Sequence, residues 1–385
     1  MHQNYTTMQY YIIAGEARGD LHGSNLIKEL KVLDNAGSIR CWGGDKMEAA
    51  GATLVKHYKD LAFMGFIEVI KNLRTIFKNL DYCKKDILAF NPAALILVDY
   101  PGFNLRVAKW AKQQGIKVIY YISPQVWAWK ESRVKAIKKS IDKMLVILPF
   151  EKEFYKKWQY QVEYVGHPLV QVIEEFNEQH LSSADVYKAA SFPNEGINLV
   201  ALLPGSRKQE ILKKLPIMLQ VAKDFPTYHF VVAKAPGLEE NFYNELLAPH
   251  KNVSSVVNKT YELLSLSKAA LVTSGTATLE TALFNVPEVV CYKGSPVSFQ
   301  IAKWLIKIKY ICLVNLIMDK EVVKELIQDD LTVSNIRREL HTILFDVNKQ
   351  QQLTKDYADL KTLLSKGGNA SANAAKSIYS FLLNA

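Results

Sequence analysis

The chain has 385 residues, of which 49% are hydrophobic and 22% are charged, and its formal net charge is +10. That length exceeds what one hydrophobic core normally holds, so we expect two folded domains, and the composition excludes a largely disordered chain. The excess of positive charge favours anionic partners, whereas four scattered cysteines without a CxxC pair argue against a zinc or disulfide framework.

The residues before Tyr10 are polar, and the apolar run that follows is interrupted by Gly15, Glu16 and Arg18. This pattern fits neither a signal peptide nor a spanning helix. No other stretch is long enough to cross a bilayer without charges. We therefore expect any contact with a membrane to be made from the cytoplasmic surface.

Apolar runs of strand length alternate with longer amphipathic segments, which is typical of parallel α/β sheets. A first series of predicted strands covers residues 10–14, 39–42, 94–98, 117–121, 143–147 and 162–164. A second series covers residues 198–203, 229–233, 269–273 and 288–292, after a polar linker at 174–198. We predict two Rossmann-like domains, 1–175 and 190–360, that face a central cleft and bind ligands at the carboxyl ends of their strands.

A charged loop follows the first predicted strand and opens a helix. It lacks a GxGxxG pattern, and Glu16, Asp20 and His22 within it offer acceptors for sugar hydroxyls or for a proton. A solvated surface loop is the alternative interpretation of the same residues.

Two segments are cationic and amphipathic. Apolar residues recur at helical spacing from Phe66 to Leu80, with basic residues on the other side, and the segment from Phe299 to Tyr310 repeats this pattern. Such segments bind anionic lipid surfaces when they stay exposed, and otherwise they form ordinary core.

Asp99 stands at the end of a strongly apolar predicted strand, before Tyr100 and Pro101. A sugar transfer with inversion needs a group that takes the proton from the attacking hydroxyl, and a carboxylate at this edge could do so. A turn-forming aspartate is the alternative. Further on, Trp127 and Trp129 precede a basic stretch. Stacking together with positive charge would suit a sugar phosphate or single-stranded nucleic acid, and a solvated basic helix is the alternative.

Two strand ends in the second half carry phosphate-binding signals. The run Leu199 to Leu203 ends in Pro-Gly-Ser-Arg, so Arg207 could clamp a diphosphate, although a plain turn would look the same. The run up to Thr273 enters Ser274-Gly275-Thr276, where backbone N–H groups at a helix N-terminus could receive phosphate. Ser274 and Thr276 would serve equally well as helix caps.

Motifs along almost the whole chain resemble those of lipid-A-disaccharide synthases, in family order: AGEARGDLHG, GGDKMEAAG, LAFMGFIEVI, LVDYPGFN, YYISPQVWAW, LPFEKEFY, VGHP, LPGSR, TSGTATLE and VNLIMDKEVVKELIQ. The resemblance implies the GT-B glycosyltransferase architecture, no metal and no cofactor. It also implies a peripheral location on the inner face of the inner membrane of a Gram-negative bacterium. The implied reaction transfers a sugar from UDP-2,3-diacylglucosamine to 2,3-diacylglucosamine 1-phosphate, which releases UDP and forms a β-1,6 bond.

The resemblance also assigns residues. It implies that Asp99 is the general base, that Glu16 and Asp20 lie on the acceptor side, and that Arg207 meets the diphosphate. The implied donor site comprises Gly205, Ser206, Arg207, Ser274, Gly275, Thr276, Ala277, Glu280 and Asn315, with Glu280 at the ribose. Acyl chains and the membrane are assigned to Met64, Phe66, Ile67, Val69, Ile70, Leu73, Ile76 and Phe77. The chain departs from the family at Arg18, where a serine is common, and at Gly102, where many members have an aspartate.

Two alternatives from other classes stay open. One is an isomerase like UDP-N-acetylglucosamine 2-epimerase, which shares the fold, and the other is a non-catalytic protein that binds lipid or nucleic acid. The resemblance favours two acylated sugars and a lipid surface as partners, without nucleic acid. Homodimerisation, and whether the C-terminal helix at about 365–385 packs on the first domain or swaps into a partner chain, also stay open.

Overall fold

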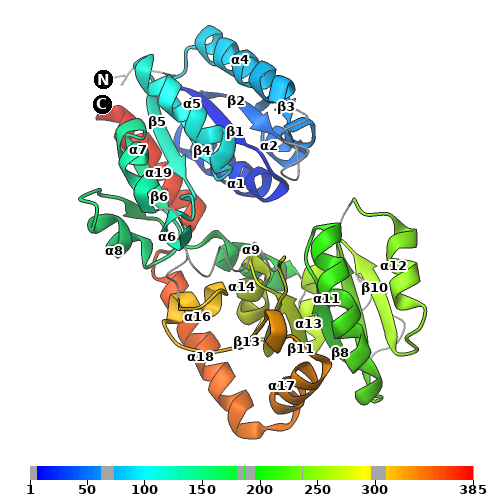
Figure 1. Cartoon of the computed structure of the whole chain (residues 1–385). Helices are drawn as coiled ribbons and strands as arrows, with labels where there is room; N and C mark the ends of the chain where they lie inside the picture. Colours follow the sequence, from blue (N-terminus) through cyan, green and yellow to red (C-terminus); the bar gives the residue numbers. More distant parts are fainter. Residues whose placement is uncertain are drawn as a thin grey trace. The chain divides into compact units, whose positions relative to one another are not determined.

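The structure is a computed structural model that describes residues 7–61, 73–129, 131–179, 186, 196–235, 237–295 and 309–384. The chain divides into two compact units, Met1–Pro168 with Leu364–Ala385, and Leu169–Leu363. Figure 1 shows that each unit is a sheet flanked by helices. The sequence places the divide between residues 175 and 190, a few residues later than the observed boundary.

The first unit contains a sheet of seven parallel strands in the order β3-β2-β1-β4-β5-β6-β7. The strands are β1 (Gln9–Ala14), β2 (Ser38–Gly43), β3 (Thr53–His57), β4 (Ala94–Val98), β5 (Lys117–Tyr121), β6 (Lys143–Val146) and β7 (Glu163–Tyr164). Its described helices are α1 (Ala17–Leu33), α2 (Asp45–Ala49), α4 (Leu73–Phe90), α5 (Pro101–Gln113), α6 (Val126–Trp129), α7 (Val134–Ser140), α8 (Glu151–Lys156) and α19 (Ala370–Leu383). The strand order reverses between β1 and β4, and ligands bind at the carboxyl ends of such a pair.

The second unit contains six parallel strands in the order β10-β9-β8-β11-β12-β13. The strands are β8 (Asn198–Leu203), β9 (Tyr228–Lys234), β10 (Val253–Val257), β11 (Ser267–Thr273), β12 (Glu288–Tyr292) and β13 (Lys324–Ile327). Its described helices are α9 (Pro168–Gln179), α11 (Lys208–Val221), α12 (Glu240–Leu247), α13 (Thr260–Leu266), α14 (Thr276–Leu283), α16 (Leu313–Met318), α17 (Val333–Phe345) and α18 (Val347–Ser365). Here the order reverses between β8 and β11. Single 3-10 turns occupy Tyr58–Leu61, Glu131–Arg133, Ala222–Asp224 and Gln328–Asp330.

The central strands are apolar after their first residue or two because both faces of each sheet are covered. In β1, Ile13 belongs to a buried cluster with Val107 of α5, whereas Ile12 faces the other way and packs with Leu26 of α1 and Ile378 of α19. Each fully buried side chain of this kind contributes about 2 kcal/mol to stability. Such continuous apolar runs are typical of parallel sheets.

The C-terminal helix α19, red in Figure 1, completes the first unit. Ala374 and Ile378 are fully buried in the same cluster as β1. The helix is also tied by polar contacts, since Asn373 Nδ2 donates to the Val165 carbonyl at 3.1 Å and Ser377 Oγ bonds Glu163 Oε2 at 2.6 Å. Within this single chain the helix packs on the first unit.

The predicted α/β class with two parallel sheets is confirmed, and every predicted strand is present. Three strands, β3, β10 and β13, are absent from the prediction, and each lies at the edge of its sheet. Within the residues that the structure describes, no helix has the length and apolar character needed to cross a membrane.

Candidate active site

Two loops of the first unit lie at the carboxyl ends of neighbouring strands. β1 and β4 are paired in register up to Ala14 and Val98, so the loop that starts at Gly15 and the residue Asp99 leave the sheet side by side. The ring of Tyr100 packs against Gly15 so closely that a Cβ there would lie 2.1 Å from Cδ1 of the ring. Only glycine permits this contact between the two loops.

Asp99 and Tyr100 both have left-handed backbone conformations, with φ of 47° and 49°. Two side chains hold this strained turn: Asn104 Nδ2 and Tyr120 Oη donate to the Asp99 carbonyl at 2.8 and 2.5 Å. Asn104 is fully buried. Backbone strain of about 1–3 kcal/mol per residue persists only where the surroundings impose it, and such strain clusters at functional sites. Sequence reasoning missed Asn104 and Tyr120, although Asn104 belongs to the LVDYPGFN motif.

The electrostatic surroundings of Asp99 suit a base. Burial and, to a smaller extent, the charge of Glu16 raise the pKa of its carboxyl group, the Tyr100 N–H and the charge of Arg18 lower it, and the resulting pKa is about 6. Glu16 and Arg18 are exposed. A carboxylate with this pKa is largely ionised at neutral pH and still basic enough to accept a proton.

Asp20 has a different environment from Glu16 and Asp99. Its side chain is 3% exposed, and its two oxygens accept the backbone N–H groups of Gly44, Lys46 and Met47 at 2.7, 3.2 and 3.1 Å. These N–H groups belong to the first turn of α2, so the carboxylate caps that helix. Asp20 therefore fixes the Gly-Gly-Asp loop beside α1.

Two histidines lie near the same loops, His167 buried and His22 half-buried. Burial and the charge of Arg18 lower the pKa of His22 to about 4, and burial together with His22 lowers the pKa of His167 to about 3. Both imidazoles are therefore neutral at physiological pH. Among the described residues, Nδ1 of His22 has no hydrogen-bond partner.

In the second unit, the two predicted phosphate loops also leave neighbouring strands. β8 and β11 are paired up to Leu203 and Val272, so Pro204–Arg207 and Ser274–Thr276 lie at one sheet edge. Gly205 has φ of +114° and Gly275 has φ of +145°, conformations that favour glycine.

The N-terminus of α14 carries no side-chain cap. Its N-cap residue is Gly275, and the Ser274 hydroxyl donates instead to the Ile311 carbonyl at 2.9 Å. Ser274 therefore does not cap the helix, which was the alternative interpretation of the motif. A Cβ built at Gly275 would meet no atom within 4 Å, so the space beside this N-terminus is open, and the helix dipole favours an anion there.

Two cations accompany this helix end. The Arg207 side chain is 66% exposed, with Nη1 3.6 Å from Glu210 Oε1. Lys214 of α11 is 2% exposed, and its Nζ donates to the hydroxyl of Thr273, the residue that precedes Ser274. Burial lowers the pKa of Lys214, and Glu210 opposes this effect. Sequence reasoning missed Lys214, because a lysine on an amphipathic helix looks like a solvated side chain.

The remaining predicted donor residues differ in exposure. Ser206 is exposed and Ala277 is half-buried. Glu280 of α14 is 9% exposed, and Tyr261 Oη donates to its Oε1 at 3.4 Å. Tyr261 in turn packs on Phe284, with ring centroids 5.2 Å apart.

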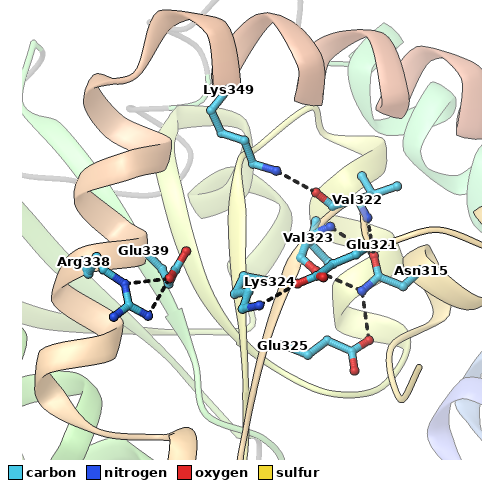
Figure 2. Close-up of polar contacts among 9 residues, drawn as sticks. All are labelled: Asn315, Glu321, Val322, Val323, Lys324, Glu325, Arg338, Glu339 and Lys349. Carbon is cyan, nitrogen blue, oxygen red and sulfur yellow. Dashed lines mark hydrogen bonds and ion pairs between the residues drawn. The ribbon is translucent and has the colours of Figure 1, made fainter. Parts of the chain in front are cut away.

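Asn315 is fully buried and its amide is used inside the protein, as Figure 2 shows. Its Oδ1 accepts the N–H groups of Val322 and Val323 at 2.8 and 3.0 Å. Its Nδ2 donates to the Val323 carbonyl at 2.9 Å and to Glu325 Oε1 at 3.0 Å. Glu325 also accepts the Ile311 N–H, and the Ile311 carbonyl binds Ser274. Asn315 thus reaches the phosphate loop through Glu325 and Ile311.

Most of the predicted acyl-binding residues, Met64, Phe66, Ile67, Val69 and Ile70, lie outside the described residues, as does the side chain of Leu73. On α4, Ile76 packs against the core of the first unit, whereas Phe77 is 60% exposed. The second amphipathic segment, 299–310, is described only at its last two residues.

Comparison with known proteins identifies a family. A family model described as lipid-A-disaccharide synthetase matches residues 10–379. The lipid-A-disaccharide synthase of Geobacter metallireducens is 38% identical over 366 residues, which are 93% of this chain and 93% of that protein. The enzyme of the same name from Coxiella burnetii is 37% identical over 378 residues, which are 97% of this chain and 98% of that protein.

Solved structures match the fold. A UDP-GlcNAc 2-epimerase from Neisseria meningitidis, bound to UDP-GlcNAc, has a TM-score of 0.68 at 14% identity, covering 98% of this chain and 100% of its own. The calicheamicin glycosyltransferase CalG4 has a TM-score of 0.61 at 16% identity, covering 98% and 99%. These likenesses extend over both units and show the fold that glycosyltransferases and epimerases share.

Proposed function

The chain belongs to the lipid-A-disaccharide synthetase family, and from that premise we propose how its two units divide the transfer reaction. As a family member it is a UDP-sugar-dependent glycosyltransferase of lipid A biosynthesis. The reaction that we infer joins UDP-2,3-diacylglucosamine to 2,3-diacylglucosamine 1-phosphate, with inversion, and yields the β-1,6-linked disaccharide 1-phosphate and UDP.

The second unit binds the donor in this proposal. The observation that carries it is the uncapped N-terminus of α14 beside the buried ammonium of Lys214. Backbone N–H groups at Gly275 and Thr276 receive the diphosphate, and Arg207 closes over it from the neighbouring loop. Positive groups fixed in advance stabilise the charge that develops on the departing UDP. Glu280 accepts the ribose hydroxyls.

The first unit supplies the base. Asp99 removes the proton from the acceptor's primary hydroxyl as that oxygen attacks the anomeric carbon and the bond to UDP breaks. Its raised pKa and the strained turn that orients it support this role. Glu16 lies on the acceptor side and increases the basicity of Asp99, and Asp20 holds the Gly-Gly-Asp loop at the start of α2. In this proposal the first unit binds the acceptor and the second unit binds the donor.

The location follows from the substrates. Both sugars carry acyl chains, so we propose that the protein works as a peripheral protein on the inner face of the inner membrane. Phe77 on the described part of α4 supports this, because a large exposed apolar side chain on a basic amphipathic helix suits a lipid interface. The acyl-binding role that the family resemblance gives to residues 64–73 is part of the same proposal.

The test is a UDP-release assay with both acylated sugars and with each omitted in turn. We expect release only when both are present, together with a disaccharide product. Conversion of UDP-N-acetylglucosamine without any acceptor would support an epimerase instead. Binding of nucleic acid or lipid in a salt-sensitive manner, without UDP affinity, would support a non-catalytic protein.

A further inference from the structure

The first unit has a pocket at the sheet edge opposite the loops of Asp99 and Glu16. Lys117 is the first residue of β5 and Lys143 the first residue of β6, so both lie at the amino ends of parallel strands. Together with the edge strand β7 and the helix α19 they line a pocket of about 1000 Å³. None of the residues that the proposed transfer uses lines this pocket.

The lining of the pocket is strongly basic. Four lysines contribute to it, Lys117, Lys143, Lys366 and Lys376, against one carboxylate, Glu163. Glu163 is already engaged, because its Oε2 lies 2.9 Å from Lys143 Nζ and 2.6 Å from the Ser377 hydroxyl. The other three lysines have no carboxylate partner within the part of the chain that the structure describes. A concave surface with uncompensated positive charge attracts anions more strongly than scattered surface lysines do.

One aromatic ring gathers two of these cations. The Nζ atoms of Lys117 and Lys143 lie 5.9 and 5.6 Å from the centroid of the Phe381 ring, which belongs to α19. Cation–π attraction to this ring, which also lines the pocket, offsets part of the repulsion between the two ammonium groups. An anion that binds between them relieves this repulsion.

We propose that this pocket is a second binding site, separate from the sugar-nucleotide site, for a phosphate-bearing group. Lysine is a common point-charge ligand of phosphate, and several lysines around one concavity match a group with more than one negative charge. The phosphate comes either from a soluble phosphate or diphosphate or from the headgroup of an anionic phospholipid. The inference does not depend on the proposed function.

The test compares two charge-matched double variants of the full chain. Lys117→Gln with Lys376→Gln removes two pocket lysines that lack a carboxylate partner. Lys28→Gln with Lys152→Gln removes two exposed lysines of the same unit that line no part of the pocket. Inorganic pyrophosphate is titrated by calorimetry in the presence of saturating UDP, so that the donor site is filled. In a parallel measurement, the proteins are sedimented with phosphatidylcholine vesicles with and without phosphatidylglycerol.

We expect the pocket variant to lose affinity about tenfold or more in one of the two measurements while the control variant keeps it. Loss in the pyrophosphate titration assigns a soluble ligand, and loss only with phosphatidylglycerol vesicles assigns a lipid headgroup. The proposal is overturned if the wild-type protein binds neither probe, or if both variants weaken binding equally. Because UDP occupies the donor site throughout, failure here leaves the transfer proposal untouched.

Discussion

The base proposed for the reaction depends on three neighbouring charges. Asp99 is buried enough to have a raised pKa, and Glu16 and Arg18 lie close enough to move that pKa in opposite directions. Arg18 adds a cation to the loop that carries Glu16, and its charge lowers the pKa of Asp99. Burial accounts for most of the rise in the pKa of Asp99, and Glu16 and Arg18 adjust that pKa in opposite directions.

The pH profile of turnover tests this balance. A base must be ionised, so we expect kcat/KM to fall as the pH drops below about 6, the pKa of Asp99. Glu16→Gln removes a negative charge and lowers the pKa of Asp99, which moves the acidic limb to lower pH. Arg18→Gln moves it to higher pH. Identical acidic limbs in wild type and both variants would contradict the assignment of Asp99.

Tyr120→Phe tests the strained turn that holds Asp99. The variant loses only the hydroxyl that donates to the Asp99 carbonyl at 2.5 Å. One hydrogen bond is worth about 1 kcal/mol, so we expect kcat to fall about fivefold with KM nearly unchanged. The matched control is Tyr10→Phe, which loses a 3.0 Å bond to Asp34 at the other end of the sheet. Equal kcat in the two variants, at equal thermal stability, would count against a positioning role.

At the scale of elements, the donor loop is held by contacts that come from outside its own motif. Ser274 is tied to Ile311, and Ile311 is tied through Glu325 to Asn315 of α16. The VNL motif therefore acts on the phosphate loop through two intermediate residues. A motif match alone would have placed the Asn315 amide against the ligand.

Asn315→Ala tests that arrangement. The change leaves the Val322 and Val323 N–H groups without their buried acceptor, so we expect the free energy of unfolding to fall by about 2–4 kcal/mol. UDP affinity should fall as well, because the Ile311 loop loosens around Ser274. Asn335→Ala is the control, since Asn335 makes an exposed bond to the Asp330 carbonyl on the same unit. Unchanged stability in urea unfolding of Asn315→Ala would contradict the network.

The central elements were predictable and the edges were not. Strands such as β4 and β8 are buried on both faces, so their sequences are continuous apolar runs that predict a strand. The edge strands β3 and β10 are mostly half-exposed, so they carry mixed side chains and no strong period. The site residues were predictable only where they follow an apolar strand.

Asp99 and Arg207 stand in the loops directly after such strands, so the sequence indicates them. Lys214 and Tyr120 come from other elements, and the way those elements pack cannot be read from the local sequence.

For the molecule as a whole, stability should depend on pH through Glu288. This residue of β12 is 1% exposed, neither of its carboxylate oxygens has a hydrogen-bond partner among the described residues, and burial raises its pKa well above the usual value. The unfolded chain releases this proton at lower pH than the folded chain does. Stability is therefore lost as the pH rises from the unfolded pKa towards the folded one.

Glu288→Gln mimics the protonated side chain at every pH. We expect the variant and the wild-type protein to have similar melting temperatures near pH 4, and the variant to melt higher at pH 8. Thermal melts over this range, with the exposed Glu321→Gln as control, measure the difference. If the melting temperatures of Glu288→Gln and the wild type differed by the same amount at every pH, Glu288 would not be protonated in the folded protein.

The central claim is that the second unit binds the diphosphate of the donor and the first unit supplies the base. The most direct measurement combines UDP affinity and UDP release, with both acylated sugars, in Arg207→Ala and Asp99→Ala. We predict that each variant loses about a hundredfold or more in turnover, while UDP affinity falls in Arg207→Ala and stays at the wild-type level in Asp99→Ala. A folded Asp99→Ala protein with near-normal turnover, or an Arg207→Ala protein with unchanged UDP affinity, would contradict the account.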